Sequence, residues 1–412
     1  MQHTSPQWAA KLRPARTECY HNREMPRTKS LANSAHRRIL SDPADVIACC
    51  MDPRVASRFI HLAGRIRLYC LAFQGPRRAH RLKGGFWFRL PREAIDIRLF
   101  DSGSLGHLLD AEAQAWNLDL RWDYSSSRSL IAGCLDEKRI AGYVIKDHTG
   151  VSGYSFFFYE EGKGLIGSLF VEGPQERVER AQFLLRHVLE TLLATPGITR
   201  IETQLPHFSF ESLEPLFTAH AHEGFRRRFM LLSLARSRWS PYGPGVSQAN
   251  HGALRNYRIL PWERRHDTAV AQVIYSAYRD HIDSEINDQY GTLTGAGRLV
   301  ESILKQRGCG EMLPKTSRVA VHLPSGKLAA ALAVTAVRPR TAHIPQIAVA
   351  PEFQNQGLGS ALLETAFQDL IQNRFEEVSL TVTDRNAGAV RLYEHLGFYT
   401  LRTFGAYTWN EK

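Results

Sequence analysis

The sequence predicts an α/β fold (α+β mixed sheet), present as two tandem copies behind a disordered, basic N-terminal extension. Three observations predict this class. Short strand patterns alternate with amphipathic helices from Ala94 to the end of the chain. The order of these elements starts again after a segment rich in proline, glycine and polar residues. Finally, 412 residues exceed what one hydrophobic core usually serves, so two domains are expected.

The first segment, residues 1–92, carries most of the chain's charge imbalance. It holds 18 of the 52 basic residues but 5 of the 41 acidic ones, so the remaining 34 basic and 36 acidic residues nearly cancel. The net charge of +11 therefore indicates no nucleic-acid partner for the folded domains. Because the segment shows no sustained periodicity, we expect it to be disordered. A transit peptide, a nucleic-acid arm and a start codon placed too far upstream all fit its composition.

The first copy of the fold is expected at 93–236. Alternation predicts an edge strand at Ile95–Phe100, followed by an acidic, apolar helix to about Trp116. Ser129–Cys134 and Ile140–Lys146 are typical of a hairpin that turns at 136–138. Two strands follow at Ser155–Tyr159 and Leu165–Val171, and then a long helix with an apolar face at Gln175–Ala194. A strand at Ile198–Leu205, a helix at Phe210–Ala221 and a closing strand at Arg226–Leu234 complete the copy.

Residues 237–256 suit an interdomain linker, and the same order then begins again in 257–412. We expect a strand at Tyr257–Leu260, helical segments at Asp267–His281 and from there to about Arg307, and a hairpin of Val319–Leu323 with Leu328–Val337. A strand at Ile344–Val349, a helix at Gly357–Gln372 and a strand at Val378–Val382 should follow. A short helix at Asn386–Leu396 and the last strands at Phe398–Trp409 end the copy.

A glycine-rich turn joins a strand to a helix at Gln354–Gly359. The amide hydrogens at a helix N-terminus lack partners and attract anions, and glycine at Gly357 and Gly359 lets phosphate oxygens approach the backbone. A tight turn without a ligand would show the same two glycines. A second motif, Asn386-Ala387-Gly388-Ala389 with Tyr393 and Gly397-Phe398, follows one strand later and argues for the ligand.

Together the two motifs resemble the GCN5-related N-acetyltransferase (GNAT) superfamily, whose signatures are Q/R-x-x-G-x-G/A and N-x-x-A-x-x-x-Y-x-x-x-G-F. The resemblance covers about 257–412 and implies acetyl-CoA as co-substrate and an N-acetyltransferase activity of the acyltransferase class. It assigns the pantetheine arm to a strand edge, the pyrophosphate to the glycine loop, the cofactor amides to Asn386 and the thioester sulfur to Tyr393. The strand and loop residues concerned are Ile347, Ala348, Val349, Gln354, Asn355, Gln356, Gly357, Leu358, Gly359 and Ser360.

Physical chemistry suits these roles. Acetyl transfer releases a thiolate, and the phenol of Tyr393 can donate a proton or hydrogen bond to it, whereas without that role Tyr393 is an aromatic core residue. An amide near Ile347 can stabilise the carbonyl oxygen during attack. The amine must also lose a proton. Gln346 stands where some family members have a glutamate base, so His343 is the candidate base, unless it is only a satisfied or exposed histidine.

The acidic stretch Asp280–Tyr290 either attracts a cationic amine or forms a solvated helix end. Six cysteines without paired spacing favour reduced thiols in the cytoplasm, and no ligand cluster predicts a metal. No stretch is long and apolar enough to suggest a membrane partner. The sequence leaves the oligomeric state and the identity of the acceptor, a small molecule or a protein, undetermined.

The first copy looks degenerate. A gapless alignment places Leu169–Val171 over Ala348–Ala350, and therefore Val178 opposite Gly357 and Arg180 opposite Gly359. Branched and acidic side chains near the corresponding helix end would exclude phosphate. This tandem arrangement is similar to that of mycothiol synthase. The favoured function is direct acetyl transfer to a primary amine in the second copy. The alternatives are a tandem-GNAT aminoacyl or peptidyl transferase and a non-catalytic acyl-CoA-binding protein.

Overall fold

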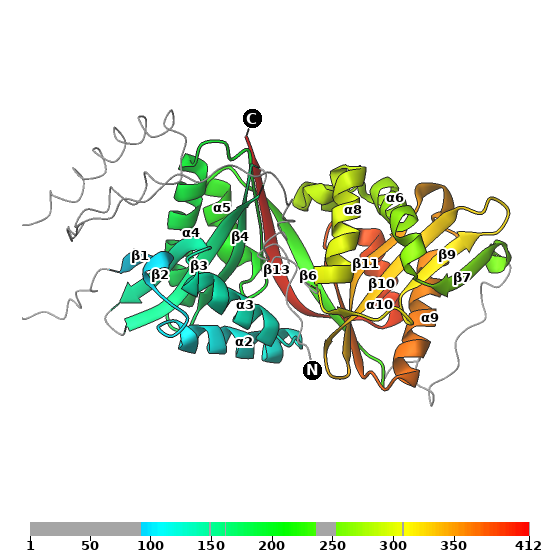
Figure 1. The fold of residues 1–412 in the computed structure, drawn as a ribbon, viewed down its shortest axis with the longest axis horizontal. Helices are drawn as coiled ribbons and strands as arrows, with labels where there is room; N and C mark the ends of the chain where they lie inside the picture. The colour runs from blue at the N-terminus through cyan, green and yellow to red at the C-terminus, as the bar shows by residue number, and fades with distance from the viewer. Residues whose placement is uncertain (1–91, 148–149, 161, 236–252, 307–308, 412) are drawn as a thin grey trace, which may run out of the picture. The chain divides into compact units, whose positions relative to one another are not determined.

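The computed structural model describes residues 92–411 except 148–149, 161, 236–252 and 307–308 (Figure 1). The expected extension, apart from its last residue, and most of the expected linker lie outside the described residues. We call the described residues up to 235 the first half and those from 253 onward the second half.

The first half follows the element order expected from the sequence, with a single exception. It consists of β1 (Glu93–Asp96), α2 (Gly106–Leu120), α3 (Ser125–Asp136), β2 (Ala141–Asp147), β3 (Gly150–Glu160), β4 (Lys163–Val171), α4 (Arg177–Ala194), β5 (Arg200–Leu205), α5 (Phe210–Ala219) and β6 (Glu223–Ser233).

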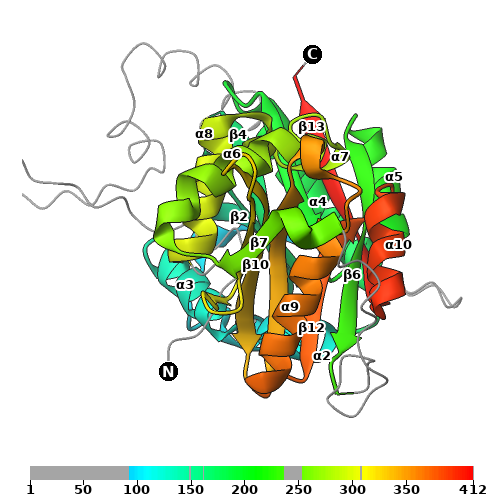
Figure 2. The ribbon, with the colours of Figure 1, turned by 90° about the vertical axis from the view of Figure 1, so that its right-hand side faces the viewer.

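The second half repeats this order and confirms the expected elements. It consists of β7 (Tyr257–Pro261), α6 (Asp267–Tyr278), α7 (Ile282–Ile286), α8 (Leu293–Glu301), β8 (Glu311–Met312), β9 (Arg318–His322), β10 (Leu328–Arg338), β11 (Thr341–Val349), α9 (Leu358–Gln372), β12 (Glu377–Thr383), α10 (Ala387–Leu396) and β13 (Tyr399–Asn410). Figure 2 shows α6 and α8 on one side of these strands and α10 on the other.

All thirteen described strands belong to one mixed sheet, and the two halves exchange their last strands in it. The order is β1-β2-β3-β4-β5-β13-β6-β12-β11-β10-β9-β7, with β8 paired to β10. Thus β13 lies between β5 and β6, and β6 lies between β13 and β12. The pairs β4–β5 and β11–β12 are parallel, and the others are antiparallel. The closing strand expected for the first copy therefore continues the sheet into the second half.

Two local expectations were wrong. Ser129–Cys134 is not a strand but part of α3, because Ile131, Cys134 and Leu135 are buried at helical spacing on one face. The edge strand ends at Asp96 instead of continuing to Phe100. The Asp96 carboxylate accepts a hydrogen bond from the backbone of Arg98 and starts a short 3-10 turn there.

Each half has a strand followed by a helix at the place that the gapless alignment compares. The strands β4 and β11 end at Val171 and Val349, and Glu176 and Gly357 directly precede the helices α4 and α9.

Candidate active site

The glycine-rich loop lies between the end of β11 and the start of α9. Gly357 is the residue before α9 and has φ +82°, a left-handed conformation that favours glycine, and no side chain caps this helix. The loop is anchored on both sides, since Gln354 Nε2 donates to Val349 O at 3.1 Å and Tyr257 donates to Gln356 Oε1 at 2.6 Å.

The space at this helix end fits a phosphate group. A Cβ added at Gly359 would meet nothing closer than Leu392 Cδ2 at 3.9 Å and Ile347 Cδ1 at 4.0 Å. The uncapped amides of the first turn and the positive end of the helix dipole therefore face open room, which is what binding of a pyrophosphate requires.

One edge of β11 is available for an extended ligand. β11 pairs with β12 only from Thr341 to Ile344, and the two strands separate from Pro345 onward. On its other edge, β11 stays paired with β10 as far as Val349. The backbone of Ile347, Ala348 and Val349, which the resemblance assigns to the pantetheine arm, borders this gap. The hydroxyl of Tyr278, at the end of α6, donates to Ile347 O of this strand at 2.7 Å.

Tyr393 and Asn386 are positioned by α10. Asn386 Oδ1 accepts from Ala389 N at 3.2 Å and caps the helix, and its amide Nδ2 lies 3.0 Å from His281 Nε2. The ring of Tyr393 is buried against Phe398. Burial, and then the negative charge of Asp283, raise the pKa of Tyr393 well above its usual value. The phenol therefore stays protonated at neutral pH.

His343 is buried in the floor of the site. Its ring contacts the rings of Trp122 at 5.0 Å and Phe229 at 6.1 Å. Its Nδ1 lies 2.9 Å from the Ser379 hydroxyl, which also lies 3.3 Å from Ala342 O. Burial lowers the pKa of His343 to about 3. His343 is therefore a weaker base than the sequence suggests.

Aromatic and acidic side chains from the stretch Asp280–Tyr290 and from α6 lie over His343 and Gln346. Tyr290 donates to Gln346 Oε1 at 2.8 Å and stacks on Tyr278 at 4.5 Å. Asp283 accepts from the Thr383 hydroxyl and lies 3.7 Å from His281 Nδ1. The acidic stretch is thus part of the site's lining at Asp283 and Tyr290, although Asp280 is exposed. Apolar residues four apart, at 282, 286 and 290, were the signal for a packed segment.

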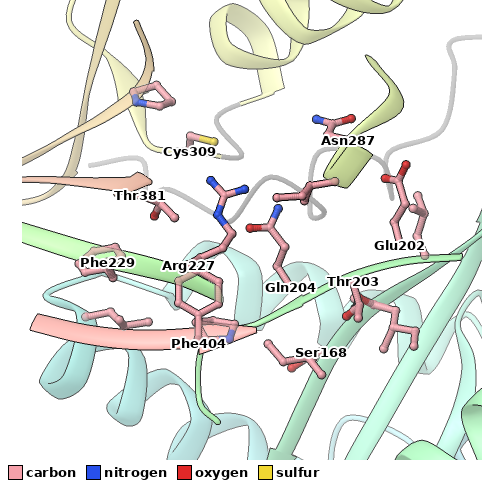
Figure 3. A pocket seen from close by; sticks show the side chains of 18 of the residues that line it. Ser168, Glu202, Thr203, Gln204, Arg227, Phe229, Asn287, Cys309, Thr381 and Phe404 are labelled. Carbon is pink, nitrogen blue, oxygen red and sulfur yellow. The ribbon is translucent and has the colours of Figure 1, made fainter. Parts of the chain in front are cut away.

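A cavity of about 250 Å³ lies beside this floor and is lined by both halves (Figure 3). Its second-half lining includes His343, Pro345, Tyr290 and Thr381. Its first-half lining includes Glu112, Trp122, Ser168, His207 and Arg227. Figure 3 shows the guanidinium of Arg227 beside the amide of Gln204, with Asn287 and Cys309 across the cavity. Side chains of both halves, including His343 of the second and Arg227 of the first, therefore border the same cavity.

The corresponding helix end in the first half is occupied by its own side chains. Glu176, in the left-handed conformation at φ +50°, precedes α4 and pairs with Arg92. Arg180 in the first turn pairs with Asp147 at 3.0 Å, and Glu179 adds a negative charge there. These carboxylates oppose phosphate binding.

Within the described ranges, no group of three or more histidine, cysteine or acidic side chains is arranged to hold a metal ion. None of the helices described is long and apolar enough to cross a bilayer. Cys134 and Cys309 are buried and form no disulfide.

Comparison with known proteins agrees with this geometry. The model of the acetyltransferase (GNAT) family matches residues 298–398. The [Ribosomal protein bS18]-alanine N-acetyltransferase of Escherichia coli (strain K12) is 45% identical over 74 residues, 18% of this chain and 49% of that protein. The chain thus spans about half the length of this relative.

Two solved structures share the fold over most of the chain. A tandem GNAT protein from the clavulanic acid biosynthesis pathway has a TM-score of 0.50 and 17% identity, over 78% of this chain and 98% of its own. A GCN5-related N-acetyltransferase from Sphaerobacter thermophilus has a TM-score of 0.52 and 15% identity, over 78% and 96%. The family match spans the glycine loop and Tyr393, so residues 298–398 are similar to the GNAT acetyltransferases, and the fold of the described chain is similar to that of the two solved structures.

Proposed function

We propose that residues 257–412 transfer the acetyl group of acetyl-CoA to a primary amine by direct attack, and that 93–236 is a degenerate copy without its own reaction. The observation that carries this proposal is the uncapped N-terminus of α9, with Gly357 in the left-handed conformation directly after β11. When bound, acetyl-CoA supplies the activated acetyl group as a thioester.

Within the proposed reaction, the loop 354–360 holds the pyrophosphate and the free edge of β11 orients the extended arm. Asn386, which already caps α10, adds a hydrogen bond through its amide. The protonated phenol of Tyr393 has no hydrogen-bond partner among the described residues, so it is available to donate to the departing sulfur.

The amine must still be deprotonated before it attacks. With a pKa of about 3, His343 cannot store a proton at neutral pH. In this proposal the ammonium group gives its proton to water before attack, and the Nε2 lone pair of His343 accepts a hydrogen bond from the resulting neutral amine and orients it. A reducing, cytoplasmic location, which six cysteines without paired spacing favour, is part of the same proposal.

Thiol release from acetyl-CoA, measured with purified protein across a panel of amines, tests the proposal. The panel should include small amines, amino acids and a peptide with an N-terminal alanine, because the curated relative acts on an alanine of a ribosomal protein. We expect release that requires an amine. Acetyl-CoA binding without release from any acceptor would instead favour the non-catalytic alternative.

A further inference from the structure

Unsatisfied nitrogen atoms gather in the wall of the cavity. Among the described residues, Trp122 Nε1, Arg227 Nε and both ring nitrogens of His207 are buried and have no hydrogen-bond partner. All three residues line the cavity. Buried polar groups are nearly always paired, so several orphans around one cavity indicate a bound molecule with acceptor atoms.

The charge of the wall defines that molecule further. Arg227 is 12% exposed, and the acid paired with it, Asp283, is 4.0 Å away and also serves Thr383. Glu202, which also lines the cavity, is neutralised by Arg200 at 2.5 Å. Burial among hydroxyl groups raises the pKa of Glu112. Arg227 is therefore the positive charge that the wall presents.

Both histidines of the wall are uncharged. The pKa of His207 is lowered to about 3 by burial and by the positive charges of Arg402 and Arg177. His343 is neutral as well. A guanidinium that faces uncharged histidines favours a planar carboxylate, which it can bind through two parallel hydrogen bonds.

The cavity also borders the place where the acceptor amine must react. His343 and Pro345 lie on β11, next to the gap between β11 and β12, and they line the same cavity as Arg227. Its lining also includes the aromatic side chains of Trp116, Phe229 and Phe404. A volume of about 250 Å³ suits a molecule of amino-acid size.

We propose that the acceptor is a small aminocarboxylate, an amino acid or a close analogue, whose carboxylate binds Arg227 while its amine faces β11. The rest of the molecule lies against the first half. There Trp122 Nε1 donates a hydrogen bond to it, and the ring nitrogens of His207 donate to or accept from its polar atoms. The first half then acts as the acceptor-binding wall of the second half's reaction. This inference rests on the proposed function and names its substrate class.

Matched acceptors test the carboxylate. We would compare phenylalanine with phenylalaninamide, and tryptophan with tryptophanamide, in acetyl-CoA-dependent thiol release. The amide has the less basic amine, so a preference for the acid cannot come from easier deprotonation. We expect kcat/KM for the acids to exceed that for the amides at least about tenfold, the scale of a charged hydrogen bond. Equal or better use of the amides would overturn the inference.

Variants on one strand test the assignment to Arg227. Arg227→Gln should raise KM for the acids about 100-fold and leave the amides nearly unchanged. Arg227→Lys keeps the positive charge but loses the planar group that makes two parallel hydrogen bonds. Its KM for the acids should therefore lie between those of the unchanged chain and of Arg227→Gln. Arg226→Gln is the matched control, because Arg226 is the preceding residue and pairs with Glu211. An equal loss with acids and amides would mean that Arg227 is only structural and would overturn the assignment.

Calorimetric titration of the same amino acids, without turnover, separates this inference from the proposed function. Binding of the acids that is lost in Arg227→Gln, with no thiol release from any acceptor, supports the site and refutes the transfer reaction. Thiol release with a neutral amine or the alanine peptide, independent of Arg227, supports the transfer reaction and overturns the carboxylate site. Absence of amino-acid binding means a cavity filled only by water and also overturns it.

Discussion

Burial changes the proton affinity of Tyr393 and His343 in opposite directions. The apolar surroundings disfavour the charged form in each case, so the phenol keeps its proton and the imidazole stays unprotonated. One side chain is thereby prepared to donate and the other to accept, at any pH near neutrality. Neither state follows from the residue type alone.

Replacement of the Tyr393 hydroxyl tests its proposed role. Tyr393→Phe should lower the rate of acetyl transfer by about 10²–10³-fold, the usual effect of losing an acid catalyst. Acetyl-CoA affinity should change little, because the ring remains packed against Phe398. Thiol release and a denaturation curve on the same preparation distinguish this from a purely structural residue. Full activity of Tyr393→Phe would transfer the role to water or another group.

Three buried histidines among the described residues predict a pH dependence of stability. In the folded chain the pKa is about 3 for His207 and His343 and about 4 for His222, against about 6.5 when unfolded. Below pH 6.5 the unfolded chain therefore binds protons that the folded chain does not. The free energy of unfolding should fall as the pH falls, by about 1.4 kcal/mol per pH unit for each histidine.

Urea unfolding between pH 6.5 and 5.0 measures this slope, and His207→Phe should reduce it by the share of one histidine. His395→Gln, on the exposed face of α10, is the control that should leave the slope unchanged. An unaltered slope in His207→Phe would show that His207 takes up a proton while folded.

At the scale of the element, the backbone at the start of α9 carries the proposed cofactor chemistry. The N-terminus of a helix offers amides and positive potential only if nothing else caps it. In α9 a left-handed glycine leaves that end open, whereas the start of α4 has Glu176 and a salt bridge between Arg180 and Asp147. The same element thus has opposite ligand preferences in the two halves.

A matched pair of glycine substitutions tests this difference. Gly357→Val should abolish acetyl-CoA binding, because the side chain would occupy the place of the pyrophosphate. Gly326→Val, in the turn between β9 and β10, imposes similar strain at φ +66° and meets nothing within 4 Å. Both should lose about 1–2 kcal/mol of stability. Calorimetry should show one site per chain in Gly326→Val and none in Gly357→Val. Unchanged binding in Gly357→Val, or two equal sites per chain, would contradict the assignment.

At the scale of the whole molecule, the exchange of β6 and β13 makes the halves depend on each other. β12 pairs with β6 of the first half along Glu377–Thr383, and β5 pairs with β13 of the second half along Arg200–Leu205. Removing either half leaves a central strand without its neighbour and exposes an apolar sheet edge.

Fragments of the chain test this dependence. Residues 253–411 alone should show no cooperative thermal transition, because β6 is missing from between β12 and β13. Mixing them with 92–235 should restore the transition and acetyl-CoA binding. A chain cleaved within 236–252 keeps all the described strands and should melt cooperatively. Cooperative melting of 253–411 by itself would show that the exchanged strands are dispensable.

The sequence by itself determined the local features. Periodicity predicted most helices and strands, and the spacing of Gly357, Gly359, Asn386 and Tyr393 indicated the family, because these patterns depend on neighbours along the chain. It failed at 129–134, where a short apolar run fits strand and helix alike and only packing chose the helix.

Only the tertiary structure decided which segments meet. The exchange of β6 and β13 depends on strand edges far apart in the chain, for which no local pattern exists. The pKa of His343 depends on Trp122 and Phe229 of the first half, and the cavity depends on Arg227 reaching it from β6. Burial and electrostatics act through space, so the low pKa of His343, the cavity and the share of the first half in its lining became visible only in the folded chain.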